Sequence, residues 1–388
     1  MENSNDKKYS FAIIGLILIL GFVLGIVFNK YLYKNEGVDT TSNIEAVYNE
    51  IINNYYQDID KEELENAAIE GMMSILKDKH SEYLTKEEQE TFNEYLGGKY
   101  YGIGIQMSKI DNSIVITRVF ENSPAANQDL KAGDIIVKIN SVNVTSFELD
   151  DVAKLIKNKS NPVKLEIVRD GKTKSFTIIP ANVNIPSVYK EVFENGNKKI
   201  GYLALNIFAE NTDEQFKQKL KELEKEGIDA LIIDLRNNSG GRLDTVSNII
   251  DMFLEKGTVM FELRKNDKVT KQYAKTKEKN SIKTAVLVNS LTASASEVLA
   301  SALKEQNGAI LVGVKTYGKG TAQETMTLSN GSLVKFTIEE WLTSKGESID
   351  KMGITPDIEE ALKEDYYKTL EYKDDNQLQK AISIISES

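Results

Sequence analysis

Hydrophobic and polar positions divide the chain into four regions with different periodicities. Residues 11–28 form an uncharged apolar run. From residue 40 to about 96, apolar residues such as Ile44, Val47 and Ile51 recur at helical spacing. Short runs bounded by turn signals, such as Asp170-Gly171, follow up to about residue 180 and indicate strands. After residue 183, strand and helix patterns alternate, which predicts an α/β sheet covered on both faces.

The last region contains two strands that each end in a polar turn. The first, residues 230–235, is a buried apolar run followed by the glycine turn at 237–241. The second, residues 284–288, precedes a group of small hydroxyl residues, and a helical pattern starts at Glu297. Residues 199–207 read as a further strand and 213–225 as a charged amphipathic helix. Because α/β sheets bind ligands at the carboxyl ends of their strands, the glycine turn is a candidate site.

The apolar run at residues 11–28 is long enough for a transmembrane helix. Lys7 and Lys8 precede it, and such a basic flank stays in the cytoplasm while the rest of the chain is exported. A cleaved signal peptide is the alternative, but no small-x-small cleavage site follows the run. We therefore expect a single-pass anchor in the cell membrane, with the catalytic part on the extracytoplasmic side.

Composition narrows the possible functions. Of the 388 residues, 41% are apolar and 28% are charged, as in ordinary globular proteins. The net charge of −11 argues against nucleic acid as a partner, because nucleic-acid binding calls for a basic face. The chain has no cysteine, so a disulfide framework, a thiolate metal site and a cysteine nucleophile are excluded. We expect no metal and no cofactor.

The second turn carries a candidate nucleophile, Ser294. A serine between a strand and a helix can be exposed beside backbone N–H groups that stabilise negative charge. A histidine base would have to be His80, the one histidine, which lies in a distant polar stretch. Lys319 is the stronger candidate, because a buried ammonium has a lowered pKa and can then accept the serine proton. The alternative is that Ser294 only eases helix packing and Lys319 is a solvated turn lysine.

Two glycine-rich segments are not nucleotide sites. The spacing from Gly313 to Lys319 matches a phosphate-binding loop, but Gly320 stands where that motif needs serine or threonine. The residues that follow alternate like a strand and do not open a helix. Gly102-x-Gly104 lacks the third glycine of a dinucleotide site, and its bare N–H groups are better suited to a peptide's terminal carboxylate.

Three sequence blocks resemble the carboxyl-terminal processing (tail-specific) peptidases, a family of serine enzymes with a PDZ domain and a Ser-Lys dyad. The blocks occur in the family's order: D-L-R-N-N-S-G-G from Asp234, T-A-S-A-S-E-V from Thr292 and G-K-G-T-A-Q from Gly318. Outside them, Y-G-I-G-I from Tyr101 resembles the family's PDZ domain, and G-I-T-P-D-I from Gly353 resembles its C-terminal signature. The similarity runs from about residue 44 to residue 381.

The resemblance implies a multidomain α+β protein. In chain order we expect a cytoplasmic N-terminus (1–10), a transmembrane anchor (11–28), a helical region (29–97), a PDZ domain of strands and one helix (98–182), a protease core that resembles the ClpP/crotonase-like fold (183–360) and a C-terminal helical segment (361–388). The N-terminal helices are candidates for forming a homodimer or for packing on the domains that follow.

The resemblance also implies a role for each residue of the catalytic site. Ser294 would be the nucleophile of an endopeptidase, Lys319 its base and Gln323 the residue that orients the lysine. The backbone N–H groups of Gly240 and Ala295 would form the oxyanion hole.

The PDZ domain implies how a substrate is recognised. Its carboxylate-binding loop would consist of Tyr101, Gly102, Ile103 and Gly104, and a helix at 147–157 would line the groove. The free apolar C-terminus of an exported or membrane protein would bind there. The family commonly has arginine and glycine after this helix, whereas this chain has Lys157-Asn158.

Other interpretations remain open. The same fold would also suit a membrane-tethered PDZ adaptor that binds protein C-termini without cleaving them. A hydrolase of small esters is less consistent with the sequence, because the G-x-S-x-G turn of such enzymes is missing. Glu297 and Glu305 either tune the charge of the lysine or are exposed helix residues. His80 is expected to be a structural or surface residue.

Overall fold

The structure, a computed structural model, describes residues 40–387 apart from 111, 158–161, 277–278 and 370. Residues up to Met72 and residues from Met73 onward form two compact units. The anchor predicted at residues 11–28 lies outside the described part of the chain. Within that part, none of the helices combines the length and apolar composition of a membrane span.

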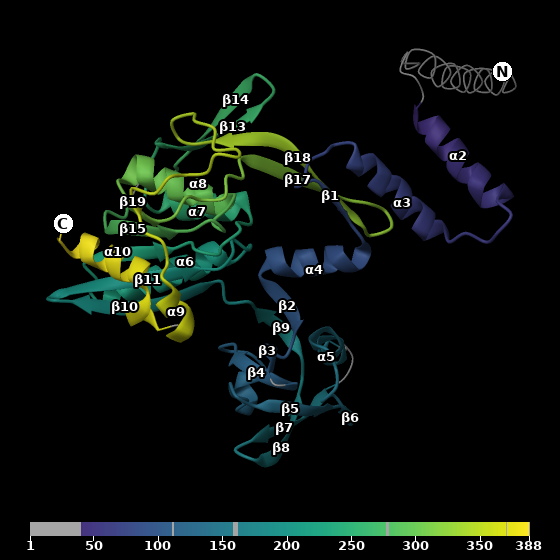
Figure 1. Ribbon diagram of the computed structural model, residues 1–388, viewed down its shortest axis with the longest axis horizontal. Coiled ribbons are helices and arrows are strands. Elements are labelled where there is room, and N and C mark those ends of the chain that lie inside the picture. Colours follow the sequence, from purple (N-terminus) through teal and green to yellow (C-terminus); the bar gives the residue numbers. More distant parts are fainter. Residues whose placement is uncertain (1–39, 111, 158–161, 277–278, 370, 388) are drawn as a thin grey trace, which may run out of the picture. The chain divides into compact units, whose positions relative to one another are not determined.

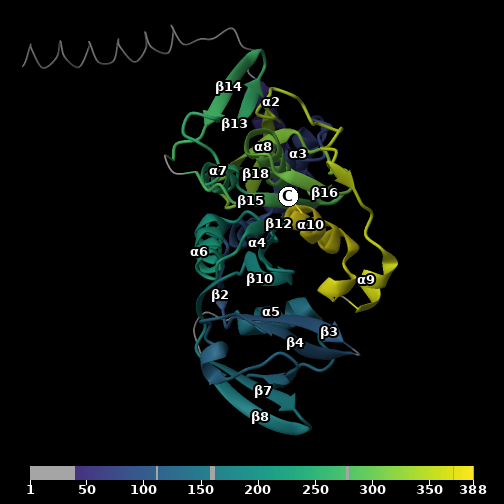
Figure 2. The same ribbon diagram turned by 90° about the vertical axis from the view of Figure 1, so that its left-hand side faces the viewer.

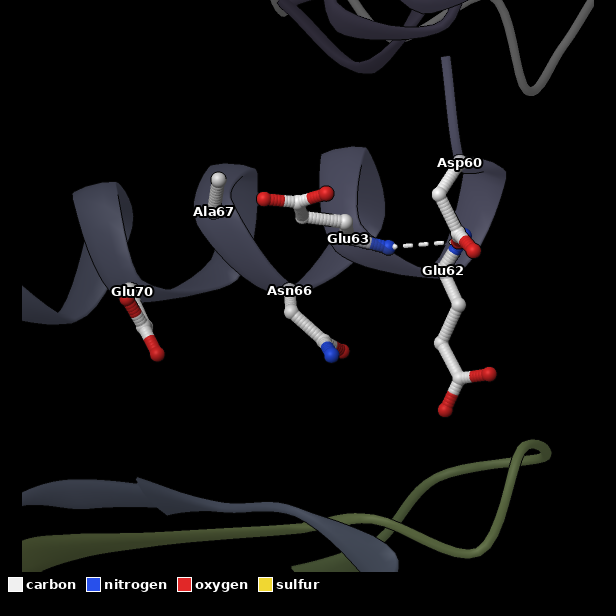
Figure 3. Close-up of a pocket in the computed structure, with 6 residues that line it drawn as sticks. All are labelled: Asp60, Glu62, Glu63, Asn66, Ala67 and Glu70. Atoms are coloured by element: carbon white, nitrogen blue, oxygen red, sulfur yellow. Dashed lines mark hydrogen bonds between the residues drawn. The ribbon is translucent and has the colours of Figure 1, made fainter.

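Two helices predicted from apolar spacing lie at the N-terminal end of the described chain. They are α2 (Thr40–Asn54) and α3 (Lys61–Ser74). Asp60 caps α3, because its carboxylate accepts the backbone N–H groups of Glu62 and Glu63 (Figure 3). Apolar side chains from both helices line one cavity of about 860 Å³.

The segment before the PDZ domain contains a short strand and a third helix. The strand is β1 (Glu82–Leu84), and the helix is α4 (Lys86–Gly97). Thr85 and Glu88 form a capping box, in which each side chain bonds to the other residue's backbone N–H.

The PDZ domain is a five-stranded antiparallel sheet with one helix. The sheet order is β3-β4-β5-β7-β8, and β6 pairs with β5. The elements are β3 (Ile105–Ile110), β4 (Ser113–Val119), β5 (Ile135–Ile139), β6 (Val142–Asn143), α5 (Leu149–Ile156), β7 (Val163–Arg169) and β8 (Lys172–Ile178). Strand β2 (Lys99–Gly102) precedes this sheet in the sequence and β9 (Ala181–Asn184) follows it. The two strands pair with each other. Because β3 is an edge strand, it can receive an added peptide strand.

The second half of the chain forms the predicted α/β sheet, in the order β10-β11-β12-β15-β16-β19. All neighbours pair in parallel except β10 and β11. The strands are β10 (Val188–Asn195), β11 (Lys198–Leu205), β12 (Ala230–Asp234), β15 (Lys283–Val288), β16 (Ile310–Gly313) and β19 (Ile358–Glu359).

Helices cover both faces of this sheet, as its continuous apolar strands predicted. On one face lie α6 (Thr212–Lys225), α7 (Leu243–Asp251) and α8 (Ala295–Ala302), which share a core with Leu231 and Ile233. The opposite face, with Ile232, packs on α10 (Asn376–Glu387). Figure 2 shows α6 and α10 on opposite sides of β12. The short elements α9 (Glu364–Thr369) and η3 (Tyr372–Asp374) precede α10.

A second sheet contains the yellow-green hairpin of Figure 1. Its strand order is β1-β18-β13-β14, and β17 pairs with β18. Its strands are β13 (Val259–Lys265), β14 (Lys268–Tyr273), β17 (Thr321–Thr327) and β18 (Leu333–Leu342). The β17–β18 hairpin contains the turn at residues 330–332. The pairing of β1 with β18 joins the segment before the PDZ domain to the catalytic half of the chain.

Candidate active site

Ser294 lies at the turn between a buried strand and a helix, as the pattern predicted. Strand β15 ends at Val288, and α8 begins at Ala295. Ser294 has φ 54° and ψ −121°, a left-handed backbone conformation that non-glycine residues rarely adopt. Its side chain is partly exposed, whereas Ser296 is fully buried and donates its hydroxyl to the backbone oxygen of Asn238. Of these two serines, only Ser294 can meet a substrate.

The two expected oxyanion donors differ in their availability. The N–H of Ala295 donates to no acceptor among the described residues, so it is free for an oxyanion. The N–H of Gly240 donates to Asn238 Oδ1 at 2.9 Å. Gly240 nevertheless lies against the serine turn, since a Cβ there would be 2.9 Å from the Cβ of Ser294. Gly240 therefore lies beside the serine turn, but its N–H has a partner in this conformation.

Lys319 is held by its backbone and has a perturbed side chain. Its N–H donates to Glu297 Oε2 at 2.9 Å, and its C=O accepts the indole N–H of Trp341 at 2.8 Å. Burial is the main cause that lowers the pKa of Lys319, and the positive charge of Lys335 lowers that pKa further. Both effects favour the neutral amine, which is the form that can accept a proton.

Glu297 connects the serine turn to the lysine loop. Its fully buried carboxylate accepts the N–H of Ser294 at 2.9 Å, the hydroxyl of Thr316 at 2.6 Å and the N–H groups of Gly318 and Lys319 at 2.7 and 2.9 Å. Glu297 is thus not an exposed helix residue. Its carboxylate binds backbone N–H groups of both the serine turn and the lysine loop. The other carboxylate, Glu305, is hydrogen-bonded to Ser344.

Gln323 lies on β17 and contacts two hydroxyl groups. Its Nε2 donates to Thr321 Oγ1 at 3.0 Å and to Thr337 Oγ1 at 3.1 Å. The amide oxygen, Oε1, has no hydrogen-bond partner among the described residues. It is the polar atom that Gln323 can offer to another group.

One cavity of about 500 Å³ brings the five predicted catalytic residues together. Ser294, Lys319, Gln323, Gly240 and Ala295 all line it. Its apolar wall comes from Phe92, Tyr95, Leu96, Leu243, Val298 and Trp341. A nucleophile, a base with a lowered pKa and a free N–H donor thus face one space that can accommodate an apolar side chain.

Comparisons with known proteins identify the family of this chain. The sequence model of peptidase family S41 matches residues 199–360, that of the PDZ domain matches residues 91–168, and that of the activating protease CtpB N-terminal domain matches residues 28–88. Over 364 residues the chain is 35% identical to a "Probable CtpA-like serine protease" of Staphylococcus aureus (strain COL), with 91% of this chain and 72% of that protein covered. The chain belongs to peptidase family S41.

Other relatives are similar over the same length. A "Probable CtpA-like serine protease" of Staphylococcus haemolyticus (strain JCSC1435) is 33% identical, with 92% of this chain and 74% of that protein covered. The solved structure of a "Putative S41 protease" from Bacteroides fragilis aligns with a TM-score of 0.55 at 19% identity, over 86% of this chain and 91% of that chain, and supports the fold. This protein is accordingly a serine peptidase of family S41 with a PDZ domain.

The PDZ loop of this S41 peptidase has the expected glycine geometry. Gly104 has φ +84°, and a Cβ at this position would be 2.1 Å from the Cβ of Ser123. The backbone oxygens of Ile103 and Gly104 accept N–H groups of Ala125 and Phe120, which fix the loop. Of the four predicted loop residues, Tyr101 and Gly102 thus end β2, where they pair with β9, and Ile103 and Gly104 connect β2 to the edge strand β3, where a peptide could add.

Tyr100, which the sequence did not single out, lies against this loop. Burial raises the pKa of its phenol, and the backbone N–H groups of Gly104 and Ile105 act in the opposite direction. Its ring packs edge-on against Phe120, with 6.4 Å between the ring centroids. The phenol of Tyr100 therefore lies near backbone donors that a peptide carboxylate would need.

The structure also shows the surroundings of His80 and Lys157. His80 is distant from the dyad in sequence, yet the charge of Lys319 is one of the causes that lower its pKa, after burial. No hydrogen bond joins His80 to Ser294 in the described chain, so no Ser-His pair forms. Lys157, at the position where the family commonly has arginine, pairs with Glu94 of α4 at 2.6 Å. Helix α4 supplies part of the apolar wall of the cavity.

Proposed function

We propose that this S41 peptidase cleaves proteins with a Ser294–Lys319 dyad. Neutral Lys319 takes the proton of Ser294 Oγ while that oxygen attacks the carbonyl carbon of the scissile peptide bond. The protonated lysine then gives its proton to the leaving amine, which leaves an acyl ester on Ser294. Water, deprotonated by Lys319, hydrolyses this ester and releases the second product.

The observation that carries this proposal is the shared cavity, in which the two side chains face one space and burial lowers the pKa of the lysine. The N–H of Ala295 would bind the oxyanion. That of Gly240 would join it once its bond to Asn238 opens. Gln323 would orient the lysine through its amide oxygen.

We propose that substrates are exported or membrane proteins with a free apolar C-terminus. The unpaired edge of β3 and the glycine loop at 101–104 support strand addition with capture of the terminal carboxylate. The basic flank and apolar run at residues 7–28 support an anchor in the cell membrane, with the catalytic part on the extracytoplasmic side.

A homodimer through the N-terminal helices is also part of the proposal. Ile44, Val47 and Met72 have exposed fractions of 50, 60 and 52%, which leaves an apolar surface on α2 and α3. Such surfaces usually mark an interaction site. A second copy of the same helices would cover it.

The test is cleavage of an unfolded protein with an apolar C-terminus by the purified full-length protein. Ser294→Ala and Lys319→Ala should each reduce cleavage by at least about 1,000-fold, because each removes one member of a unit that acts together. Amidation of the substrate's terminal carboxylate should weaken binding.

Two results would count against the proposal. Cleavage that survives in Ser294→Ala would mean that another nucleophile acts. Tight binding of the same substrate without any cleavage by the wild type would favour the PDZ adaptor over the peptidase mechanism.

A further inference from the structure

Asp78 lies outside the cavity but is connected to it through hydrogen bonds. It belongs to the loop between α3 and β1. One carboxylate oxygen accepts the N–H of His80 at 3.0 Å, and the other accepts the hydroxyls of Ser81 and Thr337, both at 2.6 Å. These donors hold the pKa of Asp78 at about 2, against the opposing effect of burial. Asp78 is therefore a carboxylate at neutral pH and can only accept hydrogen bonds.

This acceptor determines the direction of the next hydrogen bond. A threonine hydroxyl has a single hydrogen, and Thr337 gives it to Asp78. Toward Gln323 the Thr337 oxygen can then only accept, so the group that faces it must be the amide NH2. The oxygen and nitrogen of an amide are hard to distinguish by shape. Here the Asp78 carboxylate, which can only accept, fixes the direction of both hydrogen bonds and so determines which Gln323 atom is the nitrogen.

Strand geometry supports the same orientation. Gln323 lies directly opposite Thr337 in the β17–β18 pairing, next to an irregularity between Ala322 and Gln323. Such irregularities redirect a side chain. With both amide hydrogens engaged by Thr321 and Thr337, the amide oxygen is the atom left for the cavity that Lys319 also lines.

We propose that Asp78 and Thr337 are positioning residues, which hold the Gln323 amide so that its oxygen faces the amine of Lys319. The inference rests on the proposed Ser-Lys mechanism. It assigns a catalytic purpose to the loop before the PDZ domain, which contributes no residue that touches the substrate in the proposed mechanism. A flipped amide would turn its NH2 toward the lysine, where it would bind the lone pair that must accept the serine proton and would oppose the ammonium form.

The test is a double-mutant cycle in the full-length protein. Thr337→Val keeps a β-branched side chain and removes the hydroxyl, and Asp78→Asn removes the obligate acceptor. Each should lower kcat/KM about tenfold, the value of one hydrogen bond of about 1.4 kcal/mol. Combined with Gln323→Ala, Thr337→Val should have no further effect, because its action passes through Gln323, whereas Asp78→Asn also removes a charge that acts on Lys319 directly. Thr337→Ser should restore activity.

A second readout distinguishes positioning from mere structural support. An amide oxygen beside the lysine stabilises its ammonium form, so loss of that contact lowers the pKa of Lys319. The acid limb of the kcat/KM profile should move to lower pH in Thr337→Val. This variant is the right one for the profile because it changes no charge, whereas Asp78 itself acts on the pKa of Lys319.

The chain offers two controls. Thr327→Val makes the same change at an exposed position of β17 that does not line the cavity, and it should leave rate and profile unchanged. Trp341, the one tryptophan of the sequence, donates to the Lys319 carbonyl, so an unchanged emission maximum shows that the lysine loop of each variant is intact.

The outcomes separate this inference from the mechanism on which it rests. If Lys319→Ala keeps full activity, the dyad itself is wrong. If Lys319→Ala is inactive but the Thr337 and Gln323 effects simply add, the dyad holds and the positioning role is refuted. An acid limb that stays in place in Thr337→Val also refutes it.

Discussion

Ser294 shows how backbone strain and chemistry meet in one residue. Its φ of 54° costs a non-glycine residue on the order of 1–3 kcal/mol. The buried carboxylate of Glu297 offsets this cost, because it binds the N–H of Ser294 together with those of Gly318 and Lys319. One side chain thereby fixes the nucleophile and the loop of the base relative to each other. The proposed dyad depends on this connection as much as on the two reacting groups.

Lys335 offers a test of how the proposed base is kept neutral. Its charge lowers the pKa of Lys319, and its ion pair with Glu82 restrains a carboxylate that acts in the opposite direction. Lys335→Met should therefore raise the pKa of Lys319, because it removes this positive charge. Because the base must be neutral to act, the acid limb of the kcat/KM profile should move to higher pH. Activity at neutral pH should fall, and it should recover as the pH rises.

Lys271→Met is the matched control. Lys271 also pairs with a glutamate, Glu262, but it lies on β14 and does not line the catalytic cavity. Its profile should equal that of the wild type. An acid limb that stays in place or moves to lower pH in Lys335→Met would contradict the role given to Lys335.

At the scale of single residues, the sequence predicted the candidate reacting groups but not the residues that support them. Ser294, Lys319 and Gln323 lie in short motifs, so their candidacy is local information. Asp78 and Thr337 are 259 positions apart, and no local pattern connects them. The hydrogen bond from the Gly240 N–H to the Asn238 side chain likewise depends on side-chain packing, which short motifs do not encode.

The secondary-structure elements were predictable where one periodicity persisted over many residues. Helix α6 and strands β11, β12 and β15 agree with the predicted ranges within one or two residues. Strand β1 is only three residues long and forms because it pairs with β18, about 250 positions later in the chain. Such a strand depends on tertiary pairing, and its sequence alone carries no signal.

The glycine loop between β2 and β3 yields a prediction for the proposed peptide site. The N–H groups of Gly104 and Ile105, which a peptide carboxylate would need, act on the pKa of the Tyr100 phenol, which therefore lies near them. Tyr100→Phe removes the hydroxyl and keeps the ring that packs on Phe120. A peptide with a free apolar C-terminus should then bind up to about fivefold more tightly, since an oxygen that competes for these donors is gone and one such hydrogen bond is worth about 1 kcal/mol. Fluorescence anisotropy of a labelled peptide measures the change.

An amidated peptide of the same sequence provides the control for Tyr100→Phe. It lacks the charged acceptor, so its affinity should hardly change. An equal gain for both peptides would mean that the substitution acts through general loosening of the loop. No gain for the free carboxylate would show that Tyr100 does not compete with it.

For residues 73–388, the two faces of the α/β sheet determine how the C-terminal segment supports the site. Arg236 follows β12 and precedes the turn that carries Gly240. Its guanidinium contacts Asp234 at 2.6 Å and Asp375, just before α10, at 2.7 Å. All three side chains are at most 9% exposed. The charge pairs hold the pKa of Arg236 above its ordinary value despite burial. The resemblance predicted the closing helix, whereas this buried network needed the three-dimensional packing.

Asp375→Ala should therefore destabilise the protein and disturb the active site together. The substitution leaves the Arg236 cation buried with one carboxylate fewer, and breaking such a buried pair costs about 3 kcal/mol or more. It also removes the acceptor for the backbone N–H of Leu378 in the first turn of α10. Urea unfolding should show this loss of stability, and cleavage should fall because the turn with Gly240 loses its support. The adjacent Asp374→Ala, which removes a carboxylate bonded to Thr369, should cost far less. If the two variants unfold at the same urea concentration, the buried network does not join α10 to the turn in the way described.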